Sequence, residues 1–169
     1  MVTAAMKDAR LIAETVTDPE LPMLTLADLG VLRDVEVTRY GQVIVSITPT
    51  YTGCPAMDAM REDLSAALHE AGYRDVEVRT VLRPAWTTDW ITEAGRRKLT
   101  DAGIAPPGQA ARRGSGPIPL NLGQTVRSAT CPRCGSADTE QLSAFSATAC
   151  KALRRCRACQ EPFEHVKEI

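Results

Sequence analysis

The sequence predicts an α+β fold, a small sheet flanked by helices, followed by a compact cysteine-rich module. Three observations support this: the order helix, strand, strand, helix, strand in the first part, a Pro- and Gly-rich segment, and five of the six cysteines gathered after it. A chain of 169 residues has room for one ordinary domain and a small satellite. We therefore expect an α+β domain over 1–104, a flexible linker over 105–120 and the cysteine-rich module over 121–169.

The first domain should begin with a helix over 3–16, where apolar residues recur at helical spacing, and Asp18-Pro19 should end it. A hairpin follows, because apolar and polar residues alternate on both sides of a turn at 40–42. The alternating apolar residues are Val35, Val37, Val43, Val45 and Ile47.

The clearest helix is predicted to start at Pro55, because proline suits the first helical position, and to end at Gly72. Its apolar residues recur at threes and fours, which gives one buried face. They are Ala56, Met57, Met60, Leu64, Ala67, Leu68 and Ala71. A third strand around Val76 and Val78 and a short basic helix ending near Gly103 complete the domain.

The overall composition argues against partners that are held by charge. A formal net charge of −1 supplies no field to hold nucleic acid or an anionic membrane. No run approaches the roughly 20 apolar residues that span a bilayer, and the first residues lack the apolar core of a signal peptide. We expect a cytoplasmic protein without a nucleic-acid or membrane partner.

Four cysteines form two C-x-x-C knuckles, Cys131 with Cys134 and Cys156 with Cys159, and 21 residues separate the two pairs. Two such turns supply the tetrahedral thiolate set of a structural zinc site. We therefore predict a zinc ribbon that depends on its metal to fold. A rubredoxin-like iron site is the main alternative, since four thiolates also suit iron.

Two further side chains lie near the knuckles. Cys150 falls outside the C-x-x-C pattern and is interpreted as a structural or free thiol, with an additional role left open. His165 could replace a ligand, but four cysteines already fill the shell, so we expect it to be a packed or surface residue.

Cys54 is the only cysteine of the first domain and precedes the helix predicted from Pro55. Unpaired amide groups at a helix N-terminus favour a thiolate, which attacks electrophiles or binds soft metals. A small buried side chain is the alternative interpretation. His69 lies too far along the same helix to pair with Cys54, which argues against a hydrolase.

Two other features have simple structural interpretations. Asp18 and Glu20 would be turn residues if only their spacing is considered. Trp86 and Trp90 are spaced i to i+4, so they could pack in the core or contact a partner.

The segments DPELPMLTLADLGVLRDVEV and ITPTYTGCPAMDAM resemble the metal-sulfur cluster biosynthesis domain family over roughly residues 7–83. The resemblance implies that an Asp-Pro-Glu loop and a Cys-Pro loop meet, with the cysteine involved in handling iron-sulfur clusters. The matching positions here are Asp18, Pro19, Glu20, Thr50 and Cys54.

The segments WTTDWITEAGRRKLTDAGIAPP and FSATACKALRRCRACQEPFEHVK extend the resemblance over nearly the whole chain. They are similar to a family of accessory proteins from aerobic phenylacetate degradation, in which a di-iron oxygenase epoxidises the ring of phenylacetyl-CoA. The resemblance implies a maturation factor, without catalytic residues of its own, that acts on the oxygenase or reductase component.

Two functions remain open at this point. In the first, the chain delivers iron or a transient iron-sulfur cluster, and because one thiolate cannot hold a cluster, a homodimer would share it. In the second, the ribbon and the two tryptophans recruit a partner, and Cys54 is dispensable. A catalytic di-iron subunit is disfavoured because the Glu-x-x-His ligand set of a di-iron bundle is missing.

Overall fold

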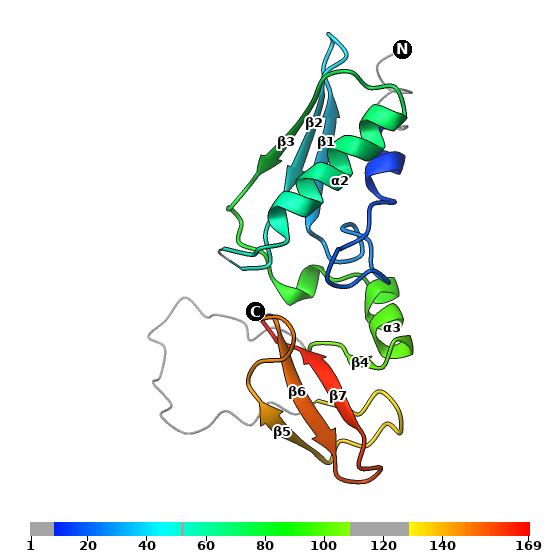
Figure 1. Ribbon diagram of the computed structural model, residues 1–169, viewed down its shortest axis with the longest axis vertical. Helices are drawn as coiled ribbons and strands as arrows, with labels where there is room; N and C mark the ends of the chain where they lie inside the picture. Colours follow the sequence, from blue (N-terminus) through cyan, green and yellow to red (C-terminus); the bar gives the residue numbers. More distant parts are fainter. Residues whose placement is uncertain (1–8, 52, 109–128) are drawn as a thin grey trace. The chain divides into compact units, whose positions relative to one another are not determined.

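The computed structural model describes residues 9–51, 53–108 and 129–169. The chain divides into two compact units, Met1–Leu99 and Thr100–Ile169, and each has its own sheet (Figure 1). The predicted fold class, a helix-flanked small sheet followed by a cysteine-rich ribbon, is confirmed. The domain limits of 1–104, 105–120 and 121–169 remain a prediction.

The first unit contains a three-stranded sheet in the order β1-β2-β3. Its strands are β1 (Leu32–Val37), β2 (Val43–Ile47) and β3 (Val76–Thr80). The predicted hairpin is confirmed, since β1 and β2 pair antiparallel around a turn in which Gly41 has a φ of 85°. β3 runs parallel to β2, an arrangement that requires a crossover connection.

Helix α2 (Met57–Glu70) is that crossover and lies across one face of the sheet (Figure 1). Its buried residues are Met57, Met60, Leu64 and Leu68, as the helical spacing predicted. The helix begins two residues later than predicted, because Pro55 and Ala56 form a tight turn in which the Met57 N–H donates to the Cys54 carbonyl at 3.3 Å. Gly72 ends the helix as expected, with a φ of 96°.

Residues 9–13 are helical, within the predicted helix of 3–16, whose first six residues lie outside the described part of the chain. The 3₁₀ turn η1 (Thr88–Trp90) and helix α3 (Glu93–Asp101) close the unit, and α3 is the predicted basic helix. Gly30 lies against Trp90: a Cβ built on Gly30 would meet the Trp90 Cβ at 2.6 Å. The chain can therefore pass this point only with a glycine.

The second unit contains a four-stranded sheet in the order β4-β7-β6-β5. Its strands are β4 (Ile104–Ala105), β5 (Thr139–Ser143), β6 (Lys151–Cys156) and β7 (Pro162–Val166). β5, β6 and β7 are antiparallel neighbours, whereas β4 pairs parallel to β7. The predicted linker therefore begins inside a strand, because buried Ala105 belongs to the ribbon core, and residues 109–120 of it lie outside the described residues.

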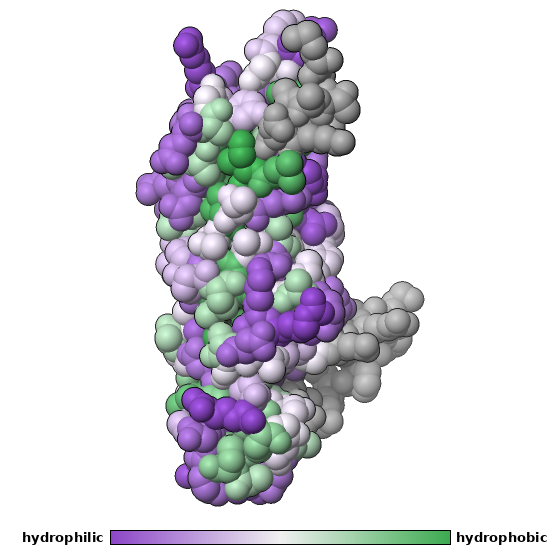
Figure 2. All heavy atoms as spheres, turned by 90° about the vertical axis from the view of Figure 1, so that its right-hand side faces the viewer, coloured by the Kyte–Doolittle hydropathy of each residue, from purple (hydrophilic) through white to green (hydrophobic). Residues whose placement is uncertain are grey.

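Hydrophilic side chains cover much of the face shown in Figure 2, with small groups of apolar side chains between them. Within the described residues, the exposed large apolar side chains are Leu11, Tyr40, Leu82, Leu142, Phe145 and Ile169. No helix among those residues has the length and apolar character needed to cross a bilayer.

Candidate functional sites

The four knuckle cysteines meet in the second unit. The sulfur atoms of Cys131, Cys134, Cys156 and Cys159 all lie within 4.8 Å of one another. Cys131 and Cys156 are buried, while Cys134 and Cys159 face solvent. Neither Cys150 nor His165 belongs to this group, as the sequence predicted, so among the described residues the set consists of four thiols.

The two knuckles have the same backbone geometry. In the first, the Cys131 N–H donates to the Ser136 carbonyl at 2.9 Å, and in the second the Cys156 N–H donates to the Glu161 carbonyl at 3.0 Å. Both turns place a residue with positive φ just before the accepting residue. Each turn therefore directs two sulfur atoms to one side, which is what the C-x-x-C spacing requires.

The spacing of the sulfur atoms fits a tetrahedral ion. The Cys131 and Cys159 Sγ atoms lie 3.8 Å apart, and the Cys134 and Cys156 Sγ atoms lie 3.5 Å apart. Four sulfurs at about 2.3 Å from a zinc ion would lie about 3.8 Å from one another. The donor set thus fits a tetrahedrally coordinated metal ion, either zinc or iron, which would hold the two knuckles together.

The four thiols lie so close together that their pKa values differ widely. Backbone N–H groups, first that of Cys159, hold the pKa of Cys156 at about 7. Although the Ser136 N–H donates to the Cys134 sulfur, the neighbouring thiols, Cys156 foremost, raise the pKa of Cys134 to about 12. Cys156 loses its proton readily and Cys134 does not. All four cysteines can therefore be thiolates together only when a cation is bound between them.

Cys54 lies in the loop between β2 and α2 and is 9% exposed. Its sulfur accepts hydrogen bonds from the Ala56 N–H and from the Tyr51 side chain. The carboxylates of Glu20 and Asp18 act on the same sulfur. Folding has therefore brought the Asp-Pro-Glu loop to the Cys-Pro loop.

The surroundings of Cys54 favour the thiol over the thiolate, which agrees with the buried side chain, the second of the two interpretations. Burial raises the pKa of the thiol, and the negative charges of Glu20 and Asp18 raise it further. Because α2 starts only at Met57, Cys54 lies before the helix cap, and a single helix-end amide, that of Ala56, reaches its sulfur. The helix terminus is thus outweighed by burial and by the two carboxylates.

The other residues of this loop pair have distinct roles. Asp18 is buried, and its Oδ1 accepts from the N–H groups of Glu20 at 2.8 Å and Leu21 at 2.7 Å, which makes it a turn residue as well. Thr50 is half-buried in the bend after β2, and within the described part of the chain it makes no hydrogen bond to Cys54. Tyr51 was missed because an aromatic residue in a loop carries no sequence signal for contact with a thiol.

The tryptophans pack within the first unit. Trp86 is 6% exposed and donates from Nε1 to the Leu29 carbonyl at 2.9 Å. The Arg33 guanidinium stacks 3.6 Å from the Trp90 ring centroid. Core packing, one of the two interpretations, is therefore correct for Trp86, whose side chain is not available to a partner.

Two family models match the chain. Residues 13–80 match the model described as an iron-sulfur cluster assembly protein, and residues 116–167 match the PaaD zinc beta ribbon domain. The chain is 43% identical over 154 residues to an Escherichia coli protein that is named as a putative subunit of 1,2-phenylacetyl-CoA epoxidase, covering 91% of this chain and 87% of that protein.

Further relatives match the first unit. A Porphyromonas gingivalis protein named an Fe-S protein maturation auxiliary factor is 32% identical over 94 residues, covering 55% of this chain and 89% of the relative. The crystal structure of a domain of unknown function, DUF59, from Bacillus anthracis has a TM-score of 0.53 and 24% identity, covering 57% of this chain and 92% of that one. That likeness supports the fold alone.

The fold and the two cysteine sites define a two-part protein, in which a domain of the iron-sulfur cluster assembly type is joined to a ribbon with four cysteines. The chain belongs to the PaaD family.

Proposed function

We propose that this protein is a non-catalytic accessory factor that delivers iron or an iron-sulfur cluster during maturation of the phenylacetyl-CoA ring-epoxidase system. The names of its relatives support both halves of this statement, since one refers to the epoxidase and others to Fe-S protein maturation. Its partner would be the oxygenase or reductase component. Reduced cysteines fit a cytoplasmic location.

The observation that carries the proposal is that the Cys54 sulfur lies within electrostatic reach of the Glu20 and Asp18 carboxylates. A thiolate is a soft donor and carboxylates are hard donors, so these three side chains would offer ligands that iron accepts if the two loops closed around the ion. The same carboxylates that hold the thiol protonated would attract a cation. When the cation arrives, its charge would favour the thiolate and release a proton.

In this proposal one copy of the chain supplies too few thiolates to hold a cluster. An iron-sulfur cluster normally takes four thiolates, and within the described residues of the first unit Cys54 is the only cysteine. A second copy of the chain would supply another Cys54, so we propose a homodimer that shares the cargo. A shell with few protein ligands would release the cargo to a client more readily than a full one.

The ribbon would hold a structural zinc ion on its four cysteines. Their sulfur spacing fits zinc, and the ribbon's own apolar core is small, consisting of Ala105, Ala129, Cys131, Cys156 and Phe163. Metal binding would therefore contribute much of the folding free energy of this unit.

A second candidate function is a module that recruits an oxygenase or reductase component without handling iron. Buried Trp86 cannot take part, but Phe145 is 64% exposed on the ribbon, and Leu142, three residues earlier, is 49% exposed. Exposed aromatic side chains are typical anchors of protein interfaces.

Metal and sulfide content decides between the two functions. We would purify the wild type, Cys54→Ser and Cys150→Ser without oxygen and measure zinc, iron, sulfide and visible absorption. Cys150→Ser is the matched control, because Cys150 lies outside the four-cysteine set. Cluster handling predicts zinc in all three and iron with sulfide lost only in Cys54→Ser.

Zinc alone in all three proteins would instead favour the recruiting module. Coexpression with the epoxidase components gives a second readout. Under the proposal, the iron content of the client falls with Cys54→Ser and is unchanged with Cys150→Ser.

A further inference from the structure

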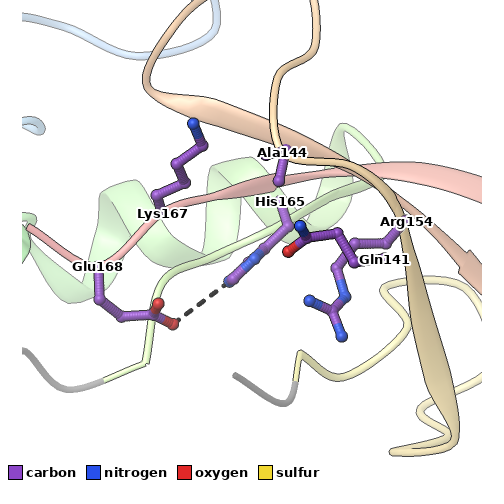
Figure 3. A pocket seen from close by; sticks show the side chains of 7 residues that line it. Gln141, Ala144, Arg154, His165, Lys167 and Glu168 are labelled. Carbon is purple, nitrogen blue, oxygen red and sulfur yellow. Dashed lines mark ion pairs between the residues drawn. The ribbon is translucent and has the colours of Figure 1, made fainter. Parts of the chain in front are cut away.

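The ribbon unit contains a pocket of about 260 Å³ that belongs to neither cysteine site. It is lined by Gln141, Ala144, Ala152, Arg154, His165, Lys167 and Glu168, which come from β5, β6, β7 and the residues next to them. Figure 3 shows the side chains of Gln141, Arg154 and His165 gathered around the same space.

Arg154 is the unusual member of this lining, because it is a cation with only 2% of its surface exposed. Its Nη2 donates to the Thr139 Oγ1 at 3.2 Å, while its Nε is buried and has no acceptor among the described residues. A guanidinium carries five N–H donors, and buried charges in proteins are normally paired. An anion in the pocket would balance the charge of this guanidinium.

The neighbouring cations of β6 and the adjoining turn have carboxylate partners of their own. Arg155 and Arg157 both pair with Glu140, and Lys151 pairs with Glu164 at 2.7 Å. For Arg154, no ion pair within 4.0 Å is found in the part of the chain that the structure describes.

Of the other polar groups that line the pocket, Glu168 and Lys167 have partners of their own, whereas Gln141 lies next to Arg154. The Glu168 carboxylate accepts from the Gly108 N–H at 3.0 Å and lies 3.4 Å from the His165 Nε2, so it attracts Arg154 only through space. Lys167 extends away from the guanidinium, and its amine donates to the Ala149 carbonyl at 2.8 Å (Figure 3). Gln141 is exposed and offers an amide beside the guanidinium.

We propose that this pocket binds the oxyanion group of a small ligand, a carboxylate or a phosphate, against the guanidinium of Arg154 with the Gln141 amide as a second donor. The planar fork of arginine matches both groups with two parallel hydrogen bonds. The volume lies just below the roughly 300–1,000 Å³ of most small-molecule sites, so the ligand is small.

The experiment uses the full chain reconstituted with zinc and follows the Arg154 Nε–Hε and Gln141 side-chain amide signals by NMR. Phosphate and acetate are titrated separately as probes, with chloride at matched ionic strength as the reference. A saturable shift of both signals supports the site, and the probe with the lower Kd identifies the favoured oxyanion.

Variants separate the pocket from general charge effects. Gln141→Glu places a carboxylate at the site and should weaken binding at least about tenfold, since like charges at contact distance repel strongly in a partly buried site. Gln42→Glu is the matched control, the same change on a residue of the other unit, and should leave the Kd unchanged. Glu168→Gln removes a competing carboxylate and should tighten binding roughly threefold.

Arg154→Met should abolish the shift of the Gln141 amide signal. If Arg154→Met does not fold, the Kd of Gln141→Glu tests the proposal in its place. The proposal is overturned if neither probe shifts the Arg154 signal beyond the chloride reference. It is also overturned if Gln141→Glu and Gln42→Glu bind the probes equally well.

Discussion

Gly135 and Gln160 occupy the same place in the two knuckles, four residues after the first cysteine of each, and both have left-handed backbone conformations. Their φ angles are 73° and 64°. Glycine adopts this conformation at no steric cost, whereas a residue with a side chain does not. The second knuckle therefore carries a local strain that the first one avoids.

Replacing glycine in the first knuckle and introducing glycine in the second should change stability in opposite directions. We expect Gly135→Ala to destabilise the zinc-loaded ribbon by about 1 kcal/mol, purely through backbone conformation, because a Cβ there meets no atom within 4 Å. Gln160→Gly should stabilise it by about 0.5 kcal/mol, the strain relief being offset partly by the lost side-chain bond to the Arg157 carbonyl. Denaturant unfolding measures both, and equal signs for the two variants would contradict the equivalence.

The close approach of Gly30 to Trp90 makes a second prediction. Gly30→Ala should destabilise the first unit by about 3 kcal/mol or more, because the new Cβ would overlap the Trp90 Cβ and its carbonyl oxygen at 2.8 Å. Gly41→Ala is the matched control: its φ is also positive and its Cβ would meet no atom within 4 Å, so about 1 kcal/mol is expected. Chemical denaturation followed by tryptophan fluorescence gives both values, and similar losses would argue against the overlap.

The acidity of Cys54 can be measured by alkylation. Its rate against pH in metal-free protein should have a midpoint above the ordinary thiol pKa of about 8.5, since burial and nearby carboxylates favour the protonated form. Glu20→Gln removes one of those negative charges, so the pKa should fall and alkylation near neutral pH should become faster. Mass spectrometry of the peptide that contains Cys54 isolates this thiol from the others.

The matched control is Glu70→Gln at the far end of α2, which should leave the alkylation profile of Cys54 unchanged. A midpoint in the wild type below the ordinary thiol value would show instead that the helix terminus controls this thiol.

Zinc binding to the ribbon should be strongly pH-dependent. Without metal the pKa of Cys134 is about 12, so binding must displace protons, and the affinity should fall as the pH falls. Competition with a chromophoric chelator between about pH 6 and about pH 8 should show more than about a tenfold change per pH unit. A pH-independent affinity would mean that the thiols are already ionised.

The elements that the sequence predicts well are those whose signal is local. Alternating valines define β1 and β2, and a period of three to four residues defines α2, because one face of each is buried in one core. The start of α2 was less predictable, since the turn at Pro55 and Ala56 depends on how the loop closes. The pairing of β4 with β7 could not be predicted, because a strand of two residues is too short to show an alternating pattern in the sequence.

The two candidate sites differ in the same way. The ribbon site could be predicted from the two C-x-x-C spacings, because each spacing places two sulfur atoms on one side of a tight turn. The acidity of Cys54 depends on Glu20 and Asp18, which reach it only through tertiary folding. The family resemblance implies that these loops meet, but the spacing of the residues alone does not indicate that two negative charges act on that sulfur.

Strand β4 precedes the ribbon's cysteines in the sequence yet forms the edge of its sheet beside β7. A ribbon excised within the segment after Ala105 would lose this strand, and the exposed edge of β7 would be free to pair with another molecule. For recombination between relatives, the point of exchange that keeps the sheet whole lies before Thr100, where the compact units divide. The ribbon sheet therefore depends on a short stretch of chain that lies outside both matched family models.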